Sequence, residues 1–235
     1  MNLPGTPSLA FLVLLFVLLP WMSLRSGRRL RAAYDASGQS AVPSGRQVWG
    51  SSLLLQAVLL YLAWRVGSGF GFRIFAAPRL DGLAILQSAG ALLACLGIRA
   101  LARAGLSEAD RRGMVVYRLS PRTGGERILQ LVTILAASVA EEAAYRGVAF
   151  AILWYALGNG WVAALLSALA FALAHLAQGW RSAGWVLLFA LVVQGLVALT
   201  GTLILAMLVH LVYDLIASTR IAAEARAMAE RGVVV

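Results

Sequence analysis

Apolar runs separated by short polar stretches dominate the pattern of this chain. The runs cover residues 9–22, 53–64, 83–98, 128–144, 148–157, 161–176, 185–199 and 203–216. A helix that spans a bilayer needs about 20 apolar residues, and shorter helices are tolerated where neighbouring helices surround them. The pattern therefore predicts an all-α, polytopic transmembrane bundle of about eight helices.

Polar stretches and glycines between the runs predict where the helices end. We expect an exposed basic loop over residues 25–50 and a polar, arginine-rich loop over residues 99–127. Gly147 predicts a break between the fourth and fifth runs, and Asn159, which lies between two glycines, predicts a turn. The tail from Thr219 predicts a short amphipathic or frayed helix.

Composition places the chain in a membrane. Hydrophobic residues make up 61% of the chain and charged residues 13%, and the mean hydropathy of +0.82 excludes a soluble globular domain. All 20 basic residues are arginines, and most lie between the apolar runs, where they orient helices in a bilayer. The lipid bilayer is therefore an expected partner, and nucleic acid is not. The single cysteine, Cys95, excludes a disulfide framework and a cysteine-based metal site.

Acidic residues and histidines inside the apolar runs are the main sign of function. Three of the ten acidic residues, Glu141, Glu142 and Asp214, lie there, as do both histidines, His175 and His210. A charge at the bilayer centre costs about 2.5–3.5 kcal/mol even on the lenient insertion scale, so these side chains need partners or water. They predict a buried polar active site.

Helical spacing pairs several of these residues. Residues four apart share a face, so Glu142 can pair with Arg146, and His210 with Asp214. One carboxylate is then neutralised inside the bundle, and Glu141 is left available for chemistry. Two aromatic residues are expected to shape the site, since Phe171 precedes His175 by one turn and Tyr145 adjoins Arg146. Packing is their expected role.

Activation of a water molecule to attack a carbonyl is the chemistry that fits these side chains, and two schemes stay open. In the first, Glu141 and His175 deprotonate the water directly, while His210 and Asp214 stabilise the oxyanion. In the second, His175, His210 and Glu141 hold a zinc ion that lowers the pKa of bound water. The chain lacks the His-Glu-x-x-His motif of zinc proteases. The metal-independent scheme is therefore favoured, with no cofactor, and zinc is the alternative.

Three motifs in order resemble the CAAX protease and bacteriocin-processing enzyme (CPBP) family, also called Abi or type II CAAX prenyl endopeptidases. The motifs are Glu141-Glu142-x-x-x-Arg146, Phe171-x-x-x-His175 and His210-x-x-x-Asp214. The resemblance implies an intramembrane endopeptidase in which Glu141 activates water and His175 is its partner. It divides the chain into an N-terminal part over residues 1–126, a catalytic helical core over residues 127–218 and a tail over residues 219–235.

The resemblance also implies a class of substrate and leaves two other functions in competition. The implied reaction is hydrolysis of a peptide bond near the C-terminus of a membrane-anchored or lipidated protein, in CAAX-type or sorting-type processing. A non-catalytic membrane scaffold or bacteriocin-immunity protein would use the same polar cavity for binding. A proton- or cation-coupled transporter would use the same Glu/His cluster as a relay.

Location and orientation follow from the arginines. Arginine-only basic residues with abundant Ala, Leu and Gly are typical of a GC-rich bacterial genome, so we expect the bacterial cytoplasmic (inner) membrane. The arginine-rich stretches are expected on the cytoplasmic side. One continuous helix through Gly147 would place Glu141 about 20 Å from that face and His175 close to it, too far apart to share a water. We therefore expect the break, which opens the site to the extracytoplasmic side.

Overall fold

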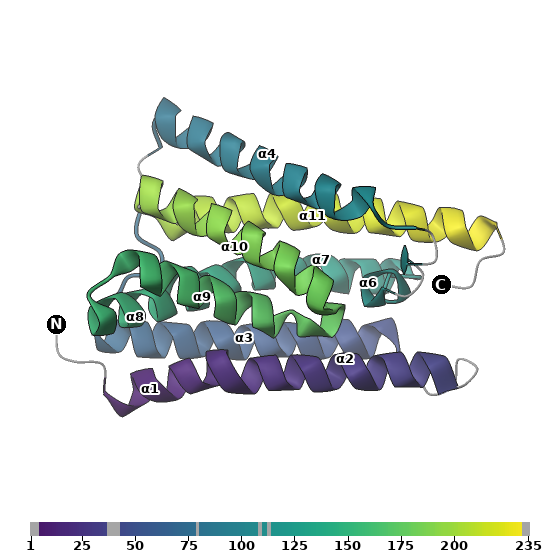
Figure 1. Cartoon of the computed structure of the whole chain (residues 1–235), viewed down its shortest axis with the longest axis horizontal. Helices are drawn as coiled ribbons and strands as arrows, with labels where there is room; N and C mark the ends of the chain where they lie inside the picture. Colours follow the sequence, from purple (N-terminus) through teal and green to yellow (C-terminus); the bar gives the residue numbers. More distant parts are fainter. Residues whose placement is uncertain (1–4, 37–42, 79, 108–109, 112–113, 232–235) are drawn as a thin grey trace.

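The computed structural model of this protein describes residues 5–36, 43–78, 80–107, 110–111 and 114–231. Within them, helix is the only regular secondary structure (Figure 1). The elements are α1 (Thr6–Val13), η1 (Leu14–Leu18), α2 (Leu19–Ala36), α3 (Gly45–Gly69), α4 (Gly82–Ala104), α6 (Val115–Arg118), α7 (Gly124–Glu141), η3 (Glu142–Ala149), α8 (Phe150–Leu157), α9 (Gly160–Ala174), η4 (Leu176–Gln178), α10 (Trp180–Thr200) and α11 (Leu203–Glu230). The segments η1 and η3 are π-helical, and η4 is a single 3₁₀ turn. The predicted all-α membrane bundle is confirmed, because six helices among the described residues are long and apolar enough to span a bilayer.

The predicted break at Gly147 is wrong. α7, η3 and α8 form one continuous helix, Gly124–Leu157, of 34 residues. Gly147 lies inside its π-helical part, where a Cβ atom would be 2.9 Å from Leu203 Cδ1 and 3.0 Å from Phe72 Cε1. The glycine is therefore explained by the close approach of neighbouring side chains and does not end the helix.

The two predicted arginine-rich loops are also shorter than expected. α2 continues through the first arginine cluster to Ala36, and α3 begins at Gly45 after a capping box formed by Ser44 and Gln47. α4 likewise runs on to Ala104, and α7 begins at Gly124, so much of the second stretch is helical too. Arginine is a good helix former, so these polar segments extend the membrane helices instead of ending them.

Two pairs of neighbouring helices set the frame of the bundle. α3 and the α7–α8 helix run parallel, since Thr133 Oγ1 donates to the Trp49 carbonyl at 3.2 Å and Gly67 meets Val148 further along both helices. α8 and α9 form an antiparallel hairpin around Gly158, which has a positive φ of 64°. Asn159 caps α9 there, which confirms the predicted turn. α10 packs on α9 and α4, and α11 packs on α4, α7 and α10 (Figure 1).

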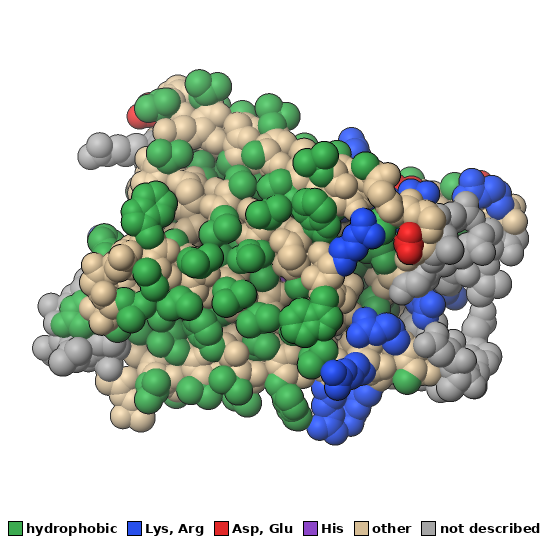
Figure 2. Space-filling model, viewed as in Figure 1, with side chains coloured by type: hydrophobic (Ala, Val, Ile, Leu, Met, Phe, Trp, Pro, Cys, Tyr) green, Lys and Arg blue, Asp and Glu red, His purple; other side chains and the backbone are tan. Residues whose placement is uncertain are grey.

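Arginines gather at one end of the bundle, which we call the arginine-rich end (Figure 2). It holds Arg25, Arg28, Arg29 and Arg31 of α2, Arg99 and Arg103 of α4, Arg118 of α6 and Arg181 of α10. Among the described arginines, only Arg65 of α3 and Arg73, which follows α3, lie near the other end of the bundle. Exposed Trp21 and Trp180 mark the first end, and exposed Trp154 and Trp161 mark the other. This distribution is typical of a bundle that crosses both membrane interfaces.

The tail beyond residue 218 continues α11 to Glu230 and packs at the arginine-rich end. Glu224 forms an ion pair with Arg103, and its carboxylate accepts a 2.7 Å hydrogen bond from the Tyr117 hydroxyl. α6 is therefore joined to the C-terminal part of α11. Residues 232–235 lie outside the described part of the chain.

Candidate functional site

The α8–α9 hairpin brings the two central motifs to the same depth. α9 has only 15 residues, so it ends at Ala174 well before it could cross a bilayer. The Ser167 hydroxyl donates to the Tyr145 carbonyl at 2.5 Å, and the ring centroids of Tyr145 and Phe171 lie 5.2 Å apart. His175 follows one turn later, level with the glutamates. The expectation that a continuous helix would hold Glu141 too far from His175 to share a water assumed that α9 crosses the whole membrane. α9 does not cross it.

Glu142 is the most enclosed charge of the site. Its side chain has no exposed surface, and its Oε1 lies 3.3 Å from Arg146 Nη1, which is the predicted pair. The same oxygen lies 2.8 Å from His210 Nδ1. The contact with Arg146 is an ion pair without hydrogen-bond alignment, and Glu142 Oε2 also has no hydrogen-bond partner. Glu142 therefore joins η3 to α11, a link that the spacing of the motifs did not predict.

His210 lies between two carboxylates. Its Nε2 is 3.5 Å from Asp214 Oδ2, which brings the predicted His210–Asp214 pair together. The His210 side chain is 5% exposed and that of Asp214 is 32% exposed, so only the aspartate reaches the edge of the bundle. A neutral imidazole can donate a hydrogen bond to only one of these two carboxylates. In this arrangement Asp214 orients His210, and neither ring nitrogen is free.

The aromatic ring of Phe171 packs between the two histidines. Its centroid lies 4.5 Å from that of His175 and 6.2 Å from that of His210. The Arg146 guanidinium carbon lies 4.0 Å from the same centroid, a cation–π contact. Phe171 is buried, as is Tyr145, which matches their predicted role of shaping the site.

Phe189 of α10 is a site residue that sequence reasoning missed. Its ring centroid is 5.1 Å from that of His210 and 4.7 Å from that of Tyr213. The side chain is buried against the same cluster as Phe171. Nothing in the sequence distinguishes this phenylalanine from the other apolar residues of its run.

His175 is partly exposed, and a backbone contact fixes its ring. Nδ1 lies 2.8 Å from the Phe171 carbonyl oxygen, one turn back along α9. A carbonyl only accepts, so Nδ1 carries the hydrogen of the neutral ring. Nε2 then has an unshared electron pair and no hydrogen bond within the described residues. The ring is therefore prepared to accept a proton at Nε2.

Glu141 differs from its neighbour in both exposure and partners. It is partly exposed, and its Oε1 accepts a 2.7 Å hydrogen bond from Gln56 Nε2 of α3. No hydrogen bond joins Glu141 to His175 in the described part of the chain. Gln56 is a second missed residue, although a signal existed, since it is the one amide in the apolar run of residues 53–64.

Helix α2 holds the turn that follows His175. The Ser23 hydroxyl accepts a 2.8 Å hydrogen bond from the Ala177 amide, and Arg31 Nη1 donates to the Ala177 carbonyl at 3.2 Å. A Cβ atom on Gly27 would lie 2.6 Å from Ala177 Cα, so only glycine allows this approach. These three residues are spaced four apart and form one face of α2. They place the turn beside the arginine-rich end.

Metal-ligating side chains do not converge in this arrangement. Across the described ranges, no group of three or more His, Cys, Asp or Glu residues is placed to hold a metal ion. Of the suggested zinc ligands, His210 has both nitrogens on carboxylates and Glu141 is bonded to Gln56. The residues as arranged do not fit a zinc site, and no catalytic step is derived through one.

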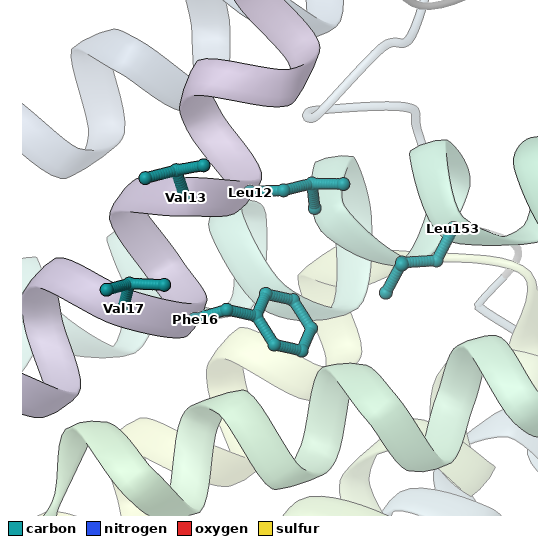
Figure 3. Close-up of a pocket in the computed structure, with 5 residues that line it drawn as sticks. All are labelled: Leu12, Val13, Phe16, Val17 and Leu153. Carbon is teal, nitrogen blue, oxygen red and sulfur yellow. The ribbon is translucent and has the colours of Figure 1, made fainter.

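An apolar pocket of about 230 Å³, drawn in Figure 3, has none of these polar residues in its lining. It is lined by Leu12, Val13, Phe16, Val17 and Leu153. None of these side chains carries a polar atom, so the pocket has no means of activating water. The predicted site residues lie instead in the polar cluster around Phe171.

Comparison with known proteins identifies one region of the chain. Residues 123–216 match a family model described as type II CAAX prenyl endopeptidase Rce1-like. The match confirms the resemblance predicted from the three motifs, all of which lie inside it. No curated protein and no solved structure matches the chain. Gln56 and the α2 residues that hold the turn precede the matched region.

Proposed function

We propose that this chain, whose residues 123–216 match the type II CAAX prenyl endopeptidase Rce1-like family model, is a CAAX protease (CPBP) family intramembrane endopeptidase that works by Glu/His water activation. The observation that carries the proposal is the unequal environment of two adjacent glutamates. Glu142 is fully enclosed and neutralised by Arg146, whereas Glu141 is partly exposed and has one side-chain partner. The buried ion pair with Arg146 uses only Glu142. Glu141 is therefore available to act as a base.

In the proposed reaction, Glu141 takes a proton from a water molecule while the water oxygen attacks the carbonyl carbon of the scissile peptide bond. The C–N bond of the tetrahedral intermediate then breaks, and the leaving amine receives the proton. His175 binds the same water through Nε2 and relays this one proton from Glu141 to the leaving amine. Its ring is held for this by the bond from Nδ1 to the Phe171 carbonyl.

Oxyanion stabilisation is assigned to the His210 side of the site. The His210 Nε2–Asp214 Oδ2 distance of 3.5 Å is long for a hydrogen bond, and Asp214 lies at the edge of the bundle. A substrate oxygen that displaces Asp214 would meet the Nε2–H group. This arrangement requires the doubly protonated ring of His210, which donates from Nδ1 to Glu142 Oε1 and from Nε2 to the oxyanion.

The arginine-rich end is the proposed cytosolic face, by the positive-inside rule. The turn after His175 contacts Ser23 and Arg31 of α2, so the site lies nearer to that end than to the other. The expectation of an extracytoplasmic site depended on a break at Gly147, which is absent. The proposed substrate is a membrane-anchored or lipidated protein cut near its C-terminus at the cytosolic surface. CAAX-type and sorting-type processing are two forms of this reaction.

Two reporters test the proposal with the purified full chain in lipid nanodiscs. One is a farnesylated peptide that ends in a CAAX tripeptide, and the other is a reporter protein with a C-terminal membrane anchor. Mass spectrometry of the products gives the cleaved bond. We expect the wild type to cleave at least one reporter and Glu141→Gln and His175→Ala to lose cleavage by more than about 100-fold.

Glu230→Gln is the matched control, because it makes the same chemical change at an exposed residue at the end of α11. It should cleave like the wild type. A wild type that leaves both reporters intact would favour the non-catalytic scaffold. Wild-type cleavage by Glu141→Gln would remove that residue from the mechanism.

A further inference from the structure

Gln56 lies outside the region that matches the family, yet it contacts the glutamate assigned as the base. Its Nε2 donates to Glu141 Oε1 at 2.7 Å, the shortest side-chain bond that α3 makes to the α7–α8 helix in the described residues. The glutamine is only 7% exposed. A buried amide in a membrane helix needs a partner. Gln56 donates to Glu141, the glutamate that is not part of the Glu142–Arg146–His210 cluster.

The other end of the same amide has no partner. Gln56 Oε1 is buried and accepts no hydrogen bond within the described residues. An unpaired buried acceptor is costly, by an amount comparable to a lost hydrogen bond, unless water or a ligand occupies the site. Because Nε2 and Oε1 belong to one planar amide, a water bound to Oε1 would lie beside the Glu141 carboxylate.

The packing register of α3 against α7 fixes the contact between Gln56 and Glu141. The two helices run parallel, and contacts on both sides of Gln56 fix their relative position. The Trp49 carbonyl accepts from Thr133 on one side, and on the other a Cβ atom on Gly67 would lie only 3.0 Å from Val148 Cγ2. Gln56 is thus presented to Glu141 by a rigid helix pair rather than by a mobile loop.

We propose that Gln56 is a positioning residue of the peptidase site. It orients the Glu141 carboxylate through Nε2 and offers Oε1 as a second acceptor for the water that Glu141 activates. The inference rests on the proposed function and adds a site residue from an N-terminal helix, outside the matched residues 123–216. A carboxylate that is free to rotate holds the water in the attacking geometry for less of the time, which lowers the rate of the chemical step.

The test is Gln56→Met, which keeps the length of the side chain and removes both polar ends. Gln130→Met is the matched control, since Gln130 is also buried and lies on α7, the helix that carries Glu141. With whichever reporter the wild type cleaves, we expect kcat of Gln56→Met to fall by about 10- to 100-fold. The KM and the midpoint of thermal unfolding should stay within twofold and a few degrees of the control.

A double-variant cycle separates positioning from a general loss of structure. Glu141→Asp shortens the acid by one methylene and itself breaks the contact with Gln56. In single-turnover cleavage with excess enzyme, adding Gln56→Met to Glu141→Asp should lower the rate by less than about twofold. A full multiplicative loss in that background would show that Gln56 does not act by orienting the Glu141 carboxylate.

Failure of this inference and failure of the proposed function give different results. If Glu141→Gln still cleaves, the assignment of the base is wrong and the role of Gln56 falls with it. If Glu141→Gln is inactive while Gln56→Met matches the control, the peptidase site stands and only the positioning role is overturned.

Discussion

Glu142 and His210 lie 2.8 Å apart in the bundle interior, although 68 residues separate them in the chain. The same Glu142 oxygen also faces Arg146, so one carboxylate holds a cation on its own helix and a ring on α11. Both contacts are buried. The pair therefore links the site to the stability of the fold, because the imidazole cannot keep its place if this carboxylate is lost.

Replacing Glu142 by Gln should destabilise the protein more than it impairs the chemistry. The substitution keeps the shape of the side chain and leaves the buried Arg146 without a counter-charge, which typically costs about 3–5 kcal/mol. We expect a lower yield in the membrane and a clearly lower midpoint of thermal unfolding in nanodiscs. The fraction that folds should retain measurable cleavage.

Adding Arg146→Met to Glu142→Gln removes both charges and should recover part of the lost stability, since an unpaired buried charge is worse than none. If Glu142→Gln folded as well as the wild type and had no activity, Glu142 would be a catalytic residue. The division of roles between the two glutamates would then be reversed.

Gly27 predicts a second connection, between α2 and the turn after His175. A Cβ atom there would lie 2.6 Å from Ala177 Cα and 2.9 Å from its carbonyl oxygen, both backbone atoms that cannot move aside cheaply. Gly27→Ala should therefore displace the turn, with at least a tenfold loss of cleavage, roughly the effect of misplacing a reacting group by a fraction of an ångström.

Gly90→Ala on α4 is the control for this change, because nothing lies within 4 Å of its added methyl group. It should be neutral or slightly stabilising, as alanine favours helix over glycine. Ser23→Ala, which removes the acceptor of the Ala177 amide, should weaken cleavage, and Ser23→Thr should restore it. Equal activity of Gly27→Ala and Gly90→Ala would show that α2 does not position the turn.

Much of this architecture follows from the sequence because the bilayer makes polar residues conspicuous. Apolar runs predicted the all-α bundle, and charged residues inside them predicted the cluster. The spacing of four correctly paired Glu142 with Arg146 and His210 with Asp214. Each of these inferences needs only the sequence of one helix and the fact that lipid surrounds it.

Relations between helices were harder to predict. A glycine in an apolar run is equally consistent with a helix end and with close packing, and only the positions of Phe72 and Leu203 show which applies to Gly147. The depth of His175 depended on α9 stopping partway across the membrane. Gln56 became a site residue only through the parallel register of α3 and α7, which no pattern within α3 contains.

Chelation should leave the enzyme unaffected if the direct mechanism is correct. Of the three residues suggested as zinc ligands, two are already committed, because His210 contacts two carboxylates and Glu141 accepts from Gln56. Incubation with EDTA or 1,10-phenanthroline should therefore change the reporter cleavage rate by less than about twofold, whereas a zinc peptidase loses its nucleophile when the metal is removed. Elemental analysis of the purified protein provides an independent check. Inhibition that added zinc reverses, together with about one zinc per chain, would require the Gln56 and Asp214 contacts to give way to a metal site.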